Sequence, residues 1–175
     1  MRGTIGSTMA LLVGMAGASA ADLVADMRAV TAEGIGGSVG LVEVTGSPAG
    51  AVFMPSLTSL PPGAHGFHVH AKGDCAPGPN DAGQVVAAGA AGGHWDPAGT
   101  GKHLGPDGEG HLGDLPALAA AADGSAGQPV TAPRITDVGR LAGLALMIHA
   151  GGDNHSDHPQ PLGGGGARIA CGVLQ

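Results

Sequence analysis

Two histidines, His68 and His70, stand two residues apart in the strand-like run GFHVH, and the chain holds nine histidines in all. Side chains at positions i and i+2 of a strand project from one face, so both imidazoles can meet one metal ion. His149 ends the apolar run LALMIHA, in which Ala145, Met147 and His149 share a face. It could reach the same metal from another strand. Taken alone, an H-x-H pair does not distinguish a site from a chance pair.

A second group lies in HWDPAGTGKHLGPDGEGHLGD, residues 94–114, which is too rich in Gly and Pro for a helix or a strand. Its candidate ligands are His94, His103, His111 and Asp114. Three imidazoles and one carboxylate suit tetrahedral zinc, and four ligands without an open position make a structural site. A bound metal would also order the loop, because its binding energy becomes folding energy. The alternative is a hydrophilic loop that happens to be rich in histidine.

Short strands must position these groups. Apolar runs recur between Gly, Pro and Asp residues, which indicates an all-β sandwich or barrel. Within 36–45 the alternation places Val39 on the same face as Leu41 and opposite Val42. Residues 117–123, ALAAAAD, have a helical composition, but Gly124 and Pro129 leave a helix little room. The unpatterned stretch 71–114 is long enough to be a functional loop.

The length of 175 residues suits one domain, preceded by a segment that we interpret as a secretory signal peptide. Residues 1–20 contain Arg2, a short apolar run and the motif ASA, which predicts cleavage after Ala20 and a periplasmic or secreted domain at 21–175. The apolar run is too short to span a bilayer. Without Arg2, the formal charge of −7 becomes −8. An acidic domain argues against nucleic-acid and anionic-membrane partners.

The chain has two cysteines, Cys75 and Cys171. An even number of cysteines in an exported protein favours a disulfide, with two buried free thiols as the alternative.

Six blocks in this order resemble copper,zinc superoxide dismutases of the bacterial, secreted type: GFHVH, GGHWDP, KHLGP, GHLGDLP, LMIHAGGDN and GGGGARIACGV. The resemblance covers nearly all of residues 21–175. It implies a Greek-key β-sandwich, or flattened eight-stranded barrel, with long metal-binding loops. It also implies one copper and one zinc per subunit, and dismutation of the superoxide anion to O2 and H2O2.

The resemblance assigns roles to individual residues. The implied copper ligands are His68, His70, His94 and His149. The implied zinc ligands are His94, His103, His111 and Asp114. Cys75 and Cys171 match the intrasubunit disulfide, Arg168 matches the arginine beside the copper channel, and Asp153 matches a carboxylate that joins a copper-ligand histidine to a zinc-ligand histidine.

The implied chemistry explains the shared ligand. A redox-cycling copper is bridged to a structural zinc through the imidazolate of His94, which can take up a proton when copper is reduced. Superoxide is an anion and the domain is acidic, so positive charge must be focused locally, and Arg168 is the implied source. His94 and Arg168 are therefore the predicted catalytic residues. We expect His65 to make structural hydrogen bonds, and His155 and His158 to be exposed.

Two other functions compete with this prediction. A non-catalytic periplasmic copper/zinc-binding module of the same fold would be expected to lose copper ligands or Arg168, and this chain keeps them all. A zinc hydrolase would need an open zinc position and a general base, and the sequence has no H-E-x-x-H motif. The sequence leaves both a monomer and a homodimer open.

Overall fold

The computed structural model describes residues 22–80 and 82–175. The predicted signal peptide, residues 1–20, lies outside the described residues. The strands are β1 (Leu23–Thr31), β2 (Gly34–Ser47), β3 (Gly50–Leu57), β4 (Gly63–His65), β5 (Phe67–His70), β6 (Gly78–Pro79), β7 (Val85–Val86), β8 (Leu118–Ala120), β9 (Val130–Ala132), β10 (Ala145–His149) and β11 (Arg168–Val173). Three short 3-10 helices are η1 (Gly89–Ala91), η2 (Val138–Leu141) and η3 (Leu162–Gly164). The described chain contains no helix that is long and apolar enough to cross a membrane.

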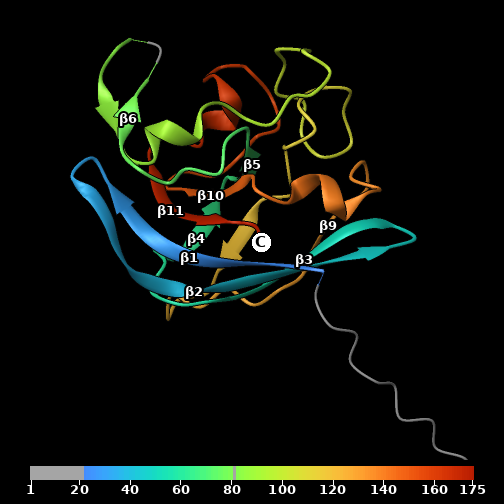
Figure 1. Cartoon of the computed structure of the whole chain (residues 1–175), viewed down its shortest axis with the longest axis horizontal. Helices are drawn as coiled ribbons and strands as arrows, with labels where there is room; N and C mark the ends of the chain where they lie inside the picture. Colours follow the sequence, from blue (N-terminus) through green and yellow to red (C-terminus); the bar gives the residue numbers. More distant parts are fainter. Residues whose placement is uncertain (1–21, 81) are drawn as a thin grey trace, which may run out of the picture.

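Seven strands form one curled antiparallel sheet in the order β5-β10-β11-β1-β2-β3-β9 (Figure 1). The segment that contains β4 and β5 is interrupted only at Gly66, and it pairs with β8 through β4 and with β10 through β5. When β4 and β5 are counted as one strand, β8 joins the seven strands of the sheet as the eighth strand of the barrel. Strands β6 and β7 form a separate hairpin. The chain crosses from β3 to β4 and from β9 to β10, as in Greek-key folds. The predicted all-β fold is confirmed.

Aliphatic side chains fill the barrel, as expected for a chain with no Tyr and two Phe. The two rings, Phe53 and Phe67, meet edge to face with their centroids 5.8 Å apart. Both are fully buried among valine, leucine, isoleucine and alanine side chains. The core therefore packs against β5, the strand that carries His68 and His70.

The predicted alternation within 36–45 is wrong at one point. Val39 is buried at 8% exposure, whereas Leu41 is 39% exposed, so the two do not share a face. The pairing of β2 with β1 shifts register here, and Gly40 has a φ of +122°. A side chain at Gly40 would clash with the carbonyl oxygen of Ser56. This β-bulge turns Val39 into the core.

Residues 118–120 form strand β8, which pairs with β4. Alanine content alone therefore did not make 117–123 helical, because pairing with a neighbouring strand outweighs a weak helix propensity.

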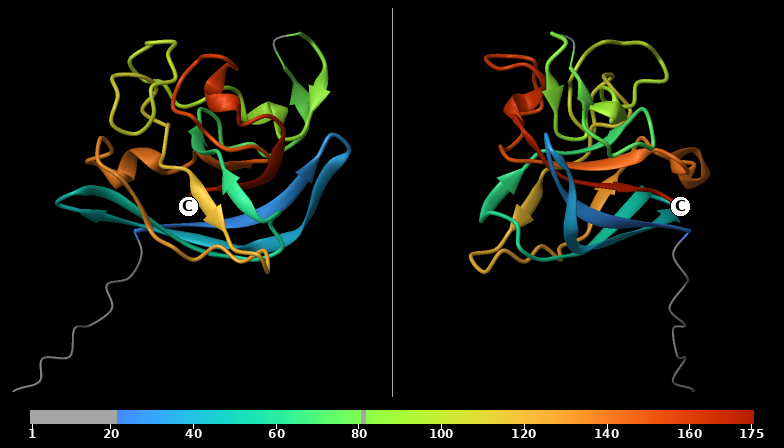
Figure 2. Two further views of the ribbon diagram at one scale, coloured as in Figure 1. Left: turned by 180° about the vertical axis from the view of Figure 1, so that it is seen from behind. Right: turned by 60° about the vertical axis from the view of Figure 1, so that its left-hand side comes forward.

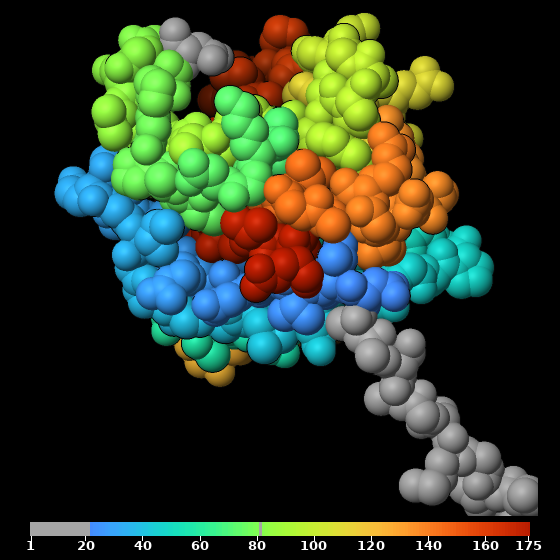
Figure 3. All heavy atoms as spheres, viewed as in Figure 1, coloured from blue at the N-terminus to red at the C-terminus, as the bar shows by residue number. Residues whose placement is uncertain are grey.

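The long loops gather at one end of the barrel (Figures 2 and 3). They comprise residues 71–117, which include the β6–β7 hairpin and η1, and residues 150–167, which include η3. A disulfide between Cys75 and Cys171 ties the first loop to β11, with the two Cα atoms 5.8 Å apart. The predicted pairing is therefore present.

Candidate metal centre

Strand β5 carries the first two candidate ligands into the interior. His68 and His70 are 0% and 1% exposed. The neighbouring strand β10 places Met147 opposite His68 and ends at His149, whose N–H donates to the carbonyl of Gly66 at 2.9 Å. His68, His70, His94 and His149 thus form a cluster whose ligand atoms all lie within 4.8 Å of one another. We call this the histidine cluster.

Hydrogen bonds on the outer nitrogens orient the rings of the histidine cluster. Nδ1 of His70 lies 2.8 Å from the carbonyl of Gly92, and Nδ1 of His149 lies 3.1 Å from the carbonyl of Gly166. A carbonyl only accepts, so each Nδ1 carries the proton. The two Nε2 atoms, 3.4 Å apart, then face each other with their lone pairs. Two facing lone pairs fit a cation between them.

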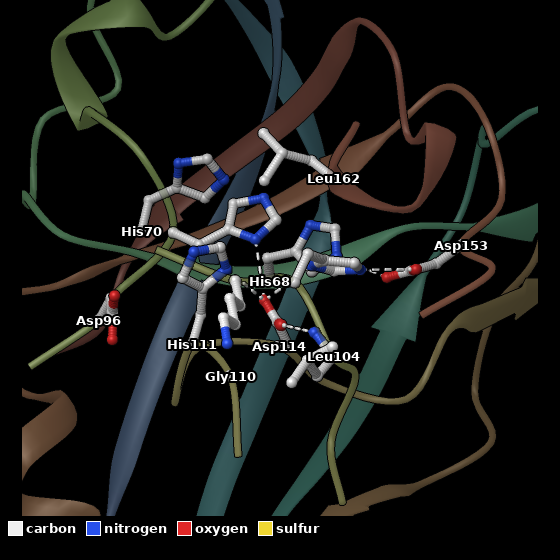
Figure 4. A network of polar contacts seen from close by, with 12 residues as sticks. His68, His70, Asp96, Leu104, Gly110, His111, Asp114, Asp153 and Leu162 are labelled. Carbon is white, nitrogen blue, oxygen red and sulfur yellow. Dashed lines mark hydrogen bonds and ion pairs between the residues drawn. The ribbon is translucent and has the colours of Figure 1, made fainter. Parts of the chain in front are cut away.

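The second cluster forms around Asp114. Its Oδ1 lies 2.9, 3.0 and 3.3 Å from Nδ1 of His94, His103 and His111 respectively. A tetrahedron with Zn–ligand bonds of about 2.0 Å has edges of about 3.3 Å. These four residues, the mixed cluster, are spaced as zinc ligands are, and Figure 4 shows His111 and Asp114 pointing into one space.

His94 belongs to both clusters. Its Nδ1 faces Asp114, and its Nε2 is buried with no hydrogen-bond partner in the part of the chain that the structure describes. Its ring stacks on His68 with centroids 4.0 Å apart. Nδ1 of His68 is also buried without a hydrogen-bond partner among the described residues. Nδ1 of His103 lies 3.0 Å from Oδ1 of Asp114 but is not aligned for a hydrogen bond. Buried imidazole nitrogens without partners are costly, and metal ions would satisfy them.

The Gly- and Pro-rich stretch 94–114 is held in place because both of its ends run beside β5. Trp95 donates its N–H to the carbonyl of Val69 at 2.8 Å, and Val69 donates to the carbonyl of Gly113 at 2.9 Å. Isolated bridges pair His70 with His94 and His68 with Asp114. Strand β5 thereby places the ligands of the loop beside its own two histidines.

Asp153 joins the two clusters from behind. Its Oδ2 accepts from Nε2 of His68 at 2.7 Å, and its Oδ1 accepts from Nε2 of His103 at 2.8 Å. Its carboxylate is completely buried. Burial would raise its pKa, but the hydrogen bonds from His103 and His68 outweigh burial and hold the pKa well below its usual range. The carboxylate therefore fixes one ring of each cluster.

Burial also sets the protonation of the rings. It lowers the pKa of His94 to about 4 and that of His149 to about 3, so both rings are neutral at pH 7. At His103 burial lowers the pKa, but the nearby carboxylates of Asp114 and Asp153 outweigh burial and raise the pKa to about 9. The rings of His94 and His149 are thus ready as ligands, whereas a metal must displace a proton from His103.

Arg168 lies at the start of β11, beside the histidine cluster. Its guanidinium donates to the carbonyls of Ala88 and Gly92, each at 2.6 Å. The Gly92 carbonyl also faces His70, so one oxygen positions both side chains. A hollow of about 250 Å³ opens here, lined by Pro79, Asn80, Val86, Gly89, Gly92, Gly93, Leu162 and Arg168. A larger hollow of about 540 Å³ also has Arg168 in its lining. Only the smaller hollow is lined by Gly92 and Gly93, which directly precede His94, and the carbonyl of Gly92 faces His70.

The remaining histidines lie as expected. Nδ1 of His65 is 2.7 Å from the carbonyl of His149, and its Nε2 is 2.7 Å from the carbonyl of Pro61. His155 and His158 are exposed. The sequence analysis assigned no role to Gly92, although Gly92 begins the block GGHWDP, because it acts through its main-chain carbonyl.

The comparisons with known proteins agree with this geometry. The copper/zinc superoxide dismutase (SODC) family model matches residues 35–174. The chain is 55% identical to superoxide dismutase [Cu-Zn] 2 of Salmonella typhimurium over 167 residues, 95% of this chain and 96% of that protein. It is 54% identical to superoxide dismutase [Cu-Zn] of Escherichia coli K12 over 164 residues, 94% of each.

Solved structures give the same result. The Cu/Zn superoxide dismutase from Brucella abortus superposes with a TM-score of 0.84 at 49% identity, covering 87% of this chain and 98% of that one. The solution structure of the monomeric copper, zinc superoxide dismutase from Salmonella enterica gives 0.76 at 56% identity, with the same coverage. On these matches, and with two ligand clusters that share His94, the chain belongs to the copper/zinc superoxide dismutase family.

Proposed function

We propose that this protein dismutates superoxide to O2 and H2O2 with one copper and one zinc ion. The observation that carries the proposal is the pair of ligand clusters that share His94, beside a hollow lined by Arg168. We assign copper to His68, His70, His94 and His149. We assign zinc to His94, His103, His111 and Asp114. When bound, copper supplies a reversible one-electron change and zinc supplies a fixed positive charge.

Arg168 binds and orients the substrate. Two of its nitrogens are committed to Ala88 and Gly92, which holds the planar guanidinium in place at the hollow. The remaining N–H groups can hydrogen-bond an anion. Burial lowers the pKa of Arg168 from its usual value, yet the group stays charged at pH 7. It supplies local positive charge in an acidic protein, which favours encounter with superoxide.

His94 handles the proton. Nδ1 is held at the mixed cluster beside Asp114, so Nε2 is the atom that can take up and release a proton toward the forming peroxide. The ring of His94 stacks on that of His68, and this contact favours the orientation in which Nε2 faces the histidine cluster. Asp153 supports this geometry by holding His68 and His103 at once.

The non-catalytic binding module is not favoured, because every proposed ligand and Arg168 are present together. The test is the rate of superoxide decay with protein loaded with copper and zinc, compared with the metal-free protein. We expect activity only in the loaded protein. A fully loaded protein that leaves superoxide decay at the uncatalysed rate would refute the enzyme and revive the binding module.

We further propose that residues 1–20 are a signal peptide that exports the domain to the periplasm. The charge and the apolar run before ASA support this. Cell fractionation with N-terminal sequencing of the exported protein should give a chain that starts at Ala21. A cytoplasmic protein that retains residues 1–20 would contradict export.

A further inference from the structure

Among the six histidines of the two clusters, His111 is oriented differently from the rest. Four of the others have an outer ring nitrogen fixed by an acceptor: His68, His70, His103 and His149. His94 is held between the clusters. The ring of His111 has one hydrogen bond among the described residues, from Nδ1 to Asp114 at 3.3 Å. Its orientation therefore depends on its main chain and on packing against the rings of His94 and His103.

The main chain at Gly110 and His111 is held from two sides. The N–H of His111 donates to the carbonyl of Lys102 at 2.8 Å. On the other side, the guanidinium of Arg134 donates to the carbonyl of His111 at 3.2 Å and to that of Gly110 at 3.0 Å. A side chain at Gly110 would clash with the carbonyl of Lys102, so the two segments cross too closely for any residue but glycine. Figure 4 shows Gly110 and His111 next to Asp114.

Arg134 is itself fixed to the barrel. It follows the end of β9 directly after Pro133 and precedes Ile135, which is 2% exposed. The N–H of Ala51, in β3, donates to the carbonyl of Ile135 at 2.8 Å. The guanidinium of Arg134 therefore holds two adjacent loop carbonyls at a fixed place relative to the barrel strands. A fork with several donors suits such paired acceptors better than a lysine does.

We propose that Arg134 is a positioning residue for the zinc site, which acts by holding the main chain of His111 so that Nδ1 faces Asp114. The inference rests on the proposed assignment of zinc to the mixed cluster. Partners that orient metal ligands commonly change metal affinity 10- to 100-fold when they are removed. Losing Arg134 should therefore weaken zinc and leave copper bound, because the histidine cluster does not contain His111.

The chain offers a matched control in Arg140. Its guanidinium carbon lies 5.1 Å from the centre of the Trp95 ring, so it touches the same loop from the same connection. The side-chain hydrogen bonds to the carbonyls of Gly110 and His111 come from Arg134 and not from Arg140. Arg140→Met therefore removes an arginine contact with the same loop without releasing the main chain of His111.

The experiment uses the protein loaded with copper and zinc. The rate of zinc release to a chromogenic chelator is measured for the parent and for Arg134→Met, Arg134→Lys and Arg140→Met. The copper content of each protein is measured as well. Arg134→Met should release zinc about 10-fold faster than the parent, Arg134→Lys should lie between them, and Arg140→Met should match the parent. Cobalt(II) placed in the zinc site should show a changed absorption spectrum in Arg134→Met alone.

Several outcomes would overturn the proposal. Zinc release and a cobalt spectrum equal to the parent in Arg134→Met would do so, and so would equally fast release from Arg140→Met. If Arg134→Met does not fold, an unchanged release rate in Arg134→Lys is decisive against it. His111→Ala distinguishes a failure of the zinc assignment from a failure of the proposed role of Arg134. If His111→Ala binds zinc like the parent, the zinc assignment fails. If His111→Ala loses zinc and the Arg134 variants do not, only the role of Arg134 fails.

Discussion

Removing the Cys75–Cys171 disulfide tests how much the stability of the protein depends on the bond between the loop of residues 71–117 and β11. Cys75 and Cys171 are 96 residues apart in the sequence, so the bond closes a very long loop. In the chain-entropy account, a cross-link over about 100 residues stabilises a protein by about 4.7 kcal/mol. For a domain of this size, 1 kcal/mol corresponds to about 2–4 °C in Tm, so we expect a loss of about 10–20 °C in Cys75→Ala/Cys171→Ala.

The free energy of unfolding should be measured in urea on the metal-free proteins, because bound metals stabilise the folded state by mass action. The parent protein treated with a thiol reductant is the matched control, since it loses the bond and keeps both sulfur atoms. Both routes should lower the free energy of unfolding by about 4.7 kcal/mol. A loss below about 1 kcal/mol by both routes would show that the barrel and loop contacts hold the segment without the bond.

The same substitution should lower turnover in the metal-loaded protein. Cys75 anchors the loop that contains Ala88 and Gly92, whose carbonyls hold Arg168. With the tether gone, the guanidinium loses its fixed position, and superoxide decay per bound copper should slow. An unchanged rate per copper would show that these two hydrogen bonds keep Arg168 in place without the disulfide.

Four further substitutions test the proposed site. His94→Ala should lower the content of both metals and His149→Ala that of copper, as metal analysis after dialysis would show; equal loss of both metals in His149→Ala contradicts the assignment. Arg168→Glu should slow superoxide decay with both metals retained, since it reverses the local charge, and an unchanged rate would remove Arg168 from the substrate path. Asp153→Ala should weaken both metals by about 10- to 100-fold, because it unpairs one ring of each cluster; affinity loss at one metal only would contradict the joint role.

Chemistry-bearing residues could be read from the sequence because their spacing follows local geometry. His68 and His70 alternate along a strand, and in the structure both point into the histidine cluster. The same local rule failed at Val39, where a bulge opposite β1 changes the face. The alternation depends on regular pairing, and the register shift is a property of two strands together.

The positioning groups could not be read in this way. Gly92 acts through its carbonyl, and Arg134 acts across more than 20 residues of sequence on His111. Main-chain carbonyls are common to all residues, so their use leaves no trace in residue type.

The sequence by itself determined the ligand types, the cysteine pair and the strand-rich character of this protein, because each depends on residue identity or on short-range periodicity. The resemblance to a known family added the shared position of His94 and the joining role of Asp153. Only the tertiary structure decided that β5 aligns both ends of the 94–114 loop, and that the carbonyl of Gly92 orients His70 and Arg168. These features join residues far apart in the chain. They exist only once the barrel has closed and the loops have packed against it.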